Sequence, residues 1–305
     1  MMAVFRLIRF PNLVLIALVQ FLLRQFLILP AFTAEYFVTG TYPPHLSNVR
    51  FMLLVLSTLL IAAGGYIIND YYDLPIDEIN KPGKVIVGKS VGEKPALTAY
   101  GILTAVGVLI GFWLAFGIGK PVMGFVNLFA AVSLWLYSSE LKKKLLVGNV
   151  LIAVLSALAL LVTGLFEPEF YRNFLFLLVY TLYAFMLTLI REIIKDMEDL
   201  EGDERGQVKS LPVRIGIMRT KWIVFMLIVI TAWMLGNTLA RFFYANTVFS
   251  FWNIFILCEL PFLMLLYFLV TAATKKDFHF LSMATKVVML LGILTLVPFY
   301  YYFLR

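Results

Sequence analysis

Two short stretches of the chain carry aspartates at the same spacing. They are NDYYDLPID at residues 69–77 and KDMEDLEGD at residues 195–203. The aspartates are Asp70, Asp73 and Asp77 in the first stretch and Asp196, Asp199 and Asp203 in the second. Because residues at i, i+3 and i+7 share one face of a helix, each stretch is expected to direct its three carboxylates the same way.

Like charges on one helical face repel, so each group of carboxylates favours a bound cation. Oxygen ligands suit Mg²⁺, which binds one or two carboxylates while keeping waters and substrate phosphate oxygens. A solvated acidic loop would explain one such group, but the repeated spacing favours metal binding. Two groups facing each other are expected to hold two or three Mg²⁺ ions.

Basic residues flank both stretches and predict an anionic substrate. They are Lys81, Lys84, Lys89 and Lys94 after the first stretch, and Arg191, Lys195, Arg205 and Lys209 around the second. Mg²⁺ and basic side chains together are typical of a diphosphate clamp. A cation transporter, which is the non-enzyme alternative, should carry its carboxylates near the bilayer midplane and gains nothing from adjacent lysines.

The composition places these motifs in a membrane protein. The 305 residues are 62% hydrophobic and only 14% charged. Continuous apolar runs predict an all-α bundle of nine membrane-spanning helices in one domain around a central cavity, because helices satisfy their backbone groups in lipid. The predicted helices are 12–31, 51–68, 96–118, 121–138, 145–165, 174–190, 222–240, 249–271 and 286–303. The motifs would follow the second and sixth helices, and this offset suggests an internal pseudo-repeat of four helices.

The distribution of basic residues predicts the orientation. With nine crossings, the face that carries both motifs holds 19 of the 25 Lys and Arg residues, and the opposite face holds five. The positive-inside rule therefore predicts that the motifs face the cytoplasm, in a cell inner or plasma membrane. The net charge of +7 is spread over short loops, so nucleic acid is not an expected partner, and no protein partner is predicted.

A diphosphate at the membrane surface, with the rest of the substrate in lipid, suggests an isoprenyl diphosphate. Its allylic C–O bond ionises when metal ions stabilise the departing diphosphate. The resulting carbocation must be shielded from water by apolar and aromatic walls. The chain has 15 Tyr and 28 Phe residues to build them.

These residues resemble the UbiA superfamily of intramembrane prenyltransferases. NDYYDLPID matches the N-D-x-x-D-x-x-x-D motif of that family, KDMEDLEGD resembles its second Asp-rich motif, and YSSELKKKLLVGN at 137–149 resembles its Tyr and Lys segment. The resemblance implies a Mg²⁺-dependent transferase that moves a prenyl group from an isoprenyl diphosphate to a lipophilic acceptor and releases diphosphate. The residues of these motifs are most similar to the branch that alkylates geranylgeranylglyceryl phosphate with geranylgeranyl diphosphate. A branch that uses aromatic acceptors of the quinone, haem or chlorophyll pathways is the alternative.

The resemblance also implies roles for single residues. The implied metal ligands are Asn69, Asp70, Asp73 and Asp77 on one side and Asp196, Asp199 and Asp203 on the other. Lys142 and Lys195 would contact diphosphate oxygens, with Lys84 and Arg191 in the same clamp, and Tyr137 would lie near the reacting carbon. Arg9 and Asn12 in RFPN resemble acceptor-side residues. Arg24, inside the first apolar run, is a further substrate-binding candidate because an intramembrane Arg is costly, and an Arg paired within the bundle is the alternative.

Overall fold

The structure is a computed structural model that describes residues 2–42, 44–75, 83, 85–168, 173–206, 208–244, 252–253 and 255–301. Within these ranges the regular structure is helical, apart from an isolated bridge between Val87 and Val91. The all-α prediction is confirmed.

The described chain combines long helices with short ones. The α-helices are α1 Met2–Leu7, α2 Phe10–Leu23, α3 Leu29–Thr39, α4 Asn48–Tyr72, α6 Glu93–Gly117, α7 Gly124–Ser139, α8 Val147–Leu165, α9 Phe174–Glu198, α10 Leu200–Arg205, α11 Leu211–Ile215, α12 Ile217–Tyr244, α14 Leu260–Thr271, α15 Lys275–Leu294 and α16 Leu296–Phe299. Two 3-10 turns, η2 Pro121–Met123 and η3 Leu141–Lys143, and two π-helical turns, η1 Arg24–Ile28 and η4 Phe255–Glu259, join or extend them.

The membrane-spanning prediction agrees with these bounds. Eight helical segments of the described chain are long and apolar enough to cross a bilayer, and Phe255–Thr271 is a shorter apolar helix where the sequence predicts the eighth crossing. The chain is therefore an integral, multi-pass membrane protein. The largest difference lies at α15, which starts at Lys275 and not at the predicted residue 286. At the motifs, α4 continues to Tyr72 and α9 to Glu198, beyond the predicted ends at 68 and 190.

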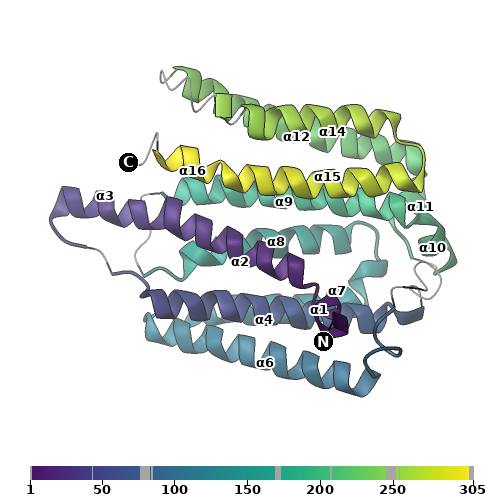
Figure 1. The fold of residues 1–305 in the computed structure, drawn as a ribbon, viewed down its shortest axis with the longest axis horizontal. Helices are drawn as coiled ribbons and strands as arrows, with labels where there is room; N and C mark the ends of the chain where they lie inside the picture. Colours follow the sequence, from purple (N-terminus) through teal and green to yellow (C-terminus); the bar gives the residue numbers. More distant parts are fainter. Residues whose placement is uncertain are drawn as a thin grey trace.

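The long helices lie side by side with their ends gathered at two opposite edges (Figure 1). Helix α2 packs against α4, α8 and α15, while α9 packs against α8, α12 and α15. Helices α6 and α7 pack on α4, and α7 also contacts α8. These contacts form a ring of helices, and the short α10 and α11 lie at the edge that also holds the ends of α4 and α9.

Helices α4 and α6 approach each other closely at Gly107. The Ser57 hydroxyl donates a 2.6 Å hydrogen bond to the Gly107 carbonyl across this contact. A Cβ atom on Gly107 would lie 2.8 Å from Ile61 Cγ1 and 3.0 Å from the Ser57 carbonyl oxygen. Since the second atom belongs to the backbone, the helices would have to separate.

Gly107→Ala is therefore expected to destabilise the protein by about 1–3 kcal/mol through overpacking. Gly101→Ala is the matched control on the same helix, because a Cβ there meets nothing within 4 Å. The measurement is the rate of thermal inactivation in detergent. Equal rates for the two variants would contradict the close contact.

Candidate active site

Both Asp motifs lie where a long helix ends. Asn69 and Asp70 occupy the last turn of α4, and Asp73 is its C-cap. Asp196 lies in the last turn of α9, and Asp199 caps that helix. The prediction that each triplet continues along one helix is wrong for the second motif. Asp203 lies on α10, a separate helix that starts after the break at Asp199.

Two carboxylates of the first motif, Asp70 and Asp73, are paired with basic side chains. Arg9 donates a 3.0 Å hydrogen bond to Asp70, and Lys142 forms an ion pair with Asp73. Asn69 donates a 2.7 Å hydrogen bond to the same Asp73 oxygen. Basic side chains from distant parts of the chain thus reduce the repulsion between these closely spaced carboxylates.

A tight corner between α7 and α8 positions Tyr137 and Lys142. Leu146, the residue before α8, adopts a left-handed conformation with φ 58°. A Cβ on Gly148 would lie 3.0 Å from Lys142 Cα and 3.2 Å from the Tyr137 ring. Glycine at this position therefore allows the start of α8 to press against the segment that carries both predicted site residues.

The second motif has its own set of polar contacts. Asn149, at the start of α8, donates a 2.8 Å hydrogen bond to Asp196. Arg191 and the buried Glu192 form an ion pair with 2.5 Å between the two atoms. Burial raises the pKa of Asp203. A nearby cation would favour its ionised form.

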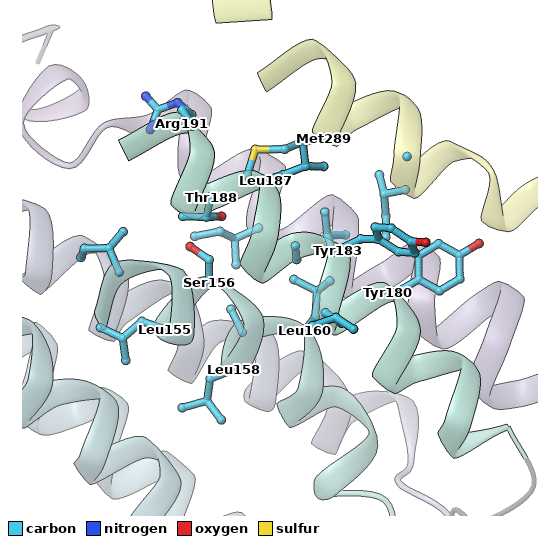
Figure 2. Close-up of a pocket in the computed structure, with 18 of the residues that line it drawn as sticks. Leu155, Ser156, Leu158, Leu160, Tyr180, Tyr183, Leu187, Thr188, Arg191 and Met289 are labelled. Carbon is cyan, nitrogen blue, oxygen red and sulfur yellow. The ribbon is translucent and has the colours of Figure 1, made fainter. Parts of the chain in front are cut away.

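A cavity of about 980 Å³ opens between these helix ends and continues among the membrane-spanning helices. Most of its wall is apolar, and its charged residues come from the end that carries the motifs. The polar residues at that end are Arg9, Asn12, Tyr66, Asn69, Tyr137, Lys142, Arg191, Glu192, Lys195 and Lys286. Figure 2 shows how the wall is built, with Tyr180, Tyr183, Leu187, Thr188 and Arg191 along α9, Leu155 to Leu160 on α8 and Met289 on α15. The cavity combines a basic mouth with a long apolar interior.

The carboxylates and Asn69 suit a hard cation such as Mg²⁺ by ligand type. In the described part of the chain, however, no three carboxylate, His or Cys side chains are gathered closely enough to hold an ion. Asp70 and Asp73 instead pair with Arg9 and Lys142. The residues thus fit the metal by chemistry, with basic side chains balancing their charge.

The structure brings most of the predicted site residues together. Arg9, Asn12, Asn69, Tyr137, Lys142, Arg191 and Lys195 line the cavity, and Asp70, Asp73 and Asp196 contact or lie beside them. Asp77 and Lys84 lie outside the described residues. Arg24 does not line the cavity. Its guanidinium lies 3.7 Å from Glu167, which follows α8 at the edge opposite the motifs, so Arg24 is paired within the bundle.

Four residues of the site are absent from the sequence prediction: Tyr66, Glu192 and Lys286, which line the cavity mouth, and Asn149, which contacts Asp196. Glu192 stands three residues before Lys195, a helical pair that could have pointed to it. Tyr66 precedes Asn69 by three residues and lies under the Arg9 guanidinium, with 5.0 Å between its ring centroid and Arg9 Cζ. Asn149 ends the YSSELKKKLLVGN segment, which could have pointed to it. Lys286 carries no local signal, because tertiary packing alone brings it to this end.

The fold and this site define a polytopic helical membrane enzyme that handles an anionic group at its mouth and an apolar group inside. The model of the UbiA prenyltransferase family matches residues 27–290. The chain therefore belongs to the UbiA prenyltransferase family, and it is a prenyltransferase.

Known relatives agree with this assignment. The digeranylgeranylglyceryl phosphate synthase of Methanosphaera stadtmanae is 30% identical over 250 residues, which cover 81% of this chain and 87% of the relative. A solved structure of a digeranylgeranylglyceryl phosphate synthase in membranes has a TM-score of 0.69 at 22% identity, covering 97% and 96% of the two chains. A UbiA homologue from Archaeoglobus fulgidus bound to GPP and Mg²⁺ has a TM-score of 0.57 at 17% identity, covering 97% and 99%. The two solved structures support the fold.

Proposed function

We propose that the protein transfers a geranylgeranyl group from geranylgeranyl diphosphate to geranylgeranylglyceryl phosphate. The observation that carries the proposal is the cavity, whose basic mouth suits phosphate groups and whose apolar interior suits prenyl chains. The name of the Methanosphaera stadtmanae relative supports this acceptor.

In the proposed reaction the allylic C–O bond of the donor breaks and a new ether bond forms to the acceptor hydroxyl. Lys142 and Lys195 bind the diphosphate oxygens and stabilise the charge that develops on them. Leu155 and Leu187 belong to an apolar wall that keeps water from the carbocation, and Tyr137 lies beside the reacting carbon. The hydroxyl proton leaves with the departing diphosphate, which is a base.

Two or three Mg²⁺ ions, when bound, would act as Lewis acids toward the diphosphate. Asn69, Asp70 and Asp73 would hold them from α4, with Asp77 as the next residue of that motif. Asp196, Asp199 and Asp203 would hold them from the ends of α9 and from α10. For Asp70 and Asp73 to bind the metal, they must release Arg9 and Lys142. The two basic side chains would then bind phosphate oxygens of the substrate.

The proposed orientation puts the motif end in the cytoplasm. It is supported by the excess of Lys and Arg in the segments on the membrane face that carries the motifs. Because Cys258 is the only cysteine, the Cys258→Ala variant is a cysteine-free background into which one reporter cysteine can be introduced. In sealed cells, a cysteine at Lys209 should be shielded from a membrane-impermeant maleimide, and labelling without permeabilisation would reverse the assignment.

The activity is tested with purified protein, Mg²⁺ and labelled geranylgeranyl diphosphate. The acceptors are geranylgeranylglyceryl phosphate and 4-hydroxybenzoate, and shorter and longer prenyl diphosphates are run in parallel. We expect metal-dependent transfer to the glyceryl phosphate. Transfer to 4-hydroxybenzoate alone would move the protein to the aromatic branch, and transfer to neither from any donor would contradict the proposal.

A further inference from the structure

Lys286 is a basic residue in the membrane-spanning part of α15, and it lies outside both Asp motifs. It lies 11 residues into that helix, about 16 Å from its start at the standard rise per residue. Its side chain is partly buried and forms no hydrogen bond or ion pair with the described residues. A charged residue at such a position is costly and is usually retained for function.

Lys286 belongs to a cluster of basic groups. Its charge interacts unfavourably with Arg9, Arg191 and Lys195 and favourably with Glu192. Arg9 and Arg191 each have a carboxylate partner, in Asp70 and Glu192. The Arg191 Nε atom is nevertheless buried without a hydrogen-bond acceptor. The Lys286 ammonium and the Arg191 Nε–H are therefore donors of this cluster that have no acceptor in the described part of the chain.

The position of Lys286 separates it from the first Asp motif. Helix α2, which follows Arg9, packs against α4, which carries Asp70, and against α15, which carries Lys286. Lys286 also lines a recess next to the main cavity, together with Phe5, Arg6, Arg9, Phe10, Pro11 and Asn12. Arg9, Asn12 and Lys286 line both spaces, so the recess adjoins the cavity mouth.

The edge of this recess has the chemistry of a membrane interface. Phe5 and Phe10 are each 45% exposed, and their rings pack edge to face with centroids 5.1 Å apart. Exposed Phe side chains on a short helix insert at the boundary between lipid headgroups and acyl chains, and basic residues beside them attract phosphate. A phosphorylated lipid that arrives sideways from the bilayer would meet these aromatic rings with its tail and Lys286 with its headgroup.

We propose that Lys286 and Arg191 bind the phosphate of the acceptor lipid, in a subsite on the α15 side of Arg9 that is separate from the donor diphosphate site. The assignment rests on the proposed function, because it requires a phosphorylated glyceryl lipid as acceptor. It gives the acceptor phosphate its own basic groups, so that the two phosphate-bearing substrates do not compete for Lys142 and Lys195.

The test compares Lys286→Met with the conservative Lys286→Arg and with Lys276→Met, an exposed lysine on the same helix. Loss of one charge-assisted contact is expected to raise the KM for geranylgeranylglyceryl phosphate about 10- to 100-fold. The KM for geranylgeranyl diphosphate should stay unchanged, Lys286→Arg should restore most of the acceptor affinity, and Lys276→Met should behave as wild type. A rise in the donor KM instead would place Lys286 in the diphosphate site and overturn the proposal.

A second measurement uses the wild-type protein and does not depend on turnover or on the folding of a variant. Lys286 is modified with an amine-reactive reagent and quantified by mass spectrometry. Geranylgeranylglyceryl phosphate should protect it, while unphosphorylated geranylgeranylglycerol should not. Equal protection by both lipids, or by neither, would contradict the subsite. Protection without any transfer to this lipid would instead refute the proposed function while retaining the binding site.

Discussion

Asp196→Asn is expected to lower kcat by about 1,000-fold, because it removes one negative charge from the group of carboxylates proposed to hold Mg²⁺ and leaves the side chain's shape almost unchanged. Asn149 donates a hydrogen bond to this carboxylate, and an Asn side chain still offers an oxygen to accept it. The fold should therefore persist. Turnover is measured with labelled donor across a range of Mg²⁺ concentrations, with Asp73→Asn tested in parallel.

Glu201→Gln is the matched control for the loss of a carboxylate near this end. Glu201 is exposed and pairs with Arg205 one helical turn away, so its charge is balanced outside the cavity. This variant should keep wild-type turnover and the wild-type dependence on Mg²⁺. If Asp196→Asn and Asp73→Asn both turned over at the control rate, the metal roles of the two motifs would be refuted.

Glu167→Leu is expected to destabilise the protein by about 3–5 kcal/mol, because it leaves the buried charge of Arg24 without its carboxylate partner. The Arg24 and Glu167 side chains are only 6% and 0% exposed. The Leu46 N–H donates a 2.7 Å hydrogen bond to Glu167, and Arg24 donates one of 2.6 Å to the Leu46 carbonyl. Burial raises the pKa of Glu167, whereas the Leu46 N–H and Arg24 lower it.

The double variant Arg24→Leu with Glu167→Leu separates the ion pair from packing. Since both charges are then absent, it should recover most of the stability that Glu167→Leu loses. The measurement is the rate of thermal inactivation in detergent, followed by turnover of the surviving protein. Turnover per folded molecule should stay near wild type if Arg24 acts only within the bundle. A large loss of turnover in a stable double variant would instead support the role in substrate binding that the sequence suggests for Arg24.

The sequence identifies much of the site because its signals are local. A repeated spacing marks the aspartates Asp70 and Asp196, and Lys142 and Tyr137 stand in a segment that resembles a family motif. Helical periodicity could also have led to Tyr66 and Glu192, which lie one turn before predicted residues. Lys286 could not be found this way, because nothing beside it in the sequence marks it and only the packing of α15 brings it to the cavity mouth.

The sequence by itself determined the membrane-embedded helical class, because apolar length and backbone hydrogen bonding leave few alternatives in lipid. It also determined which carboxylates and lysines are candidates for the reaction. The tertiary structure decided where the helices end and which charges meet. It breaks the second motif at Asp199, pairs Asp70 with Arg9 and Asp73 with Lys142, and holds Arg24 to Glu167. These pairings join residues far apart in the chain, and they form because a buried charge is stable only beside a partner that the fold brings to it.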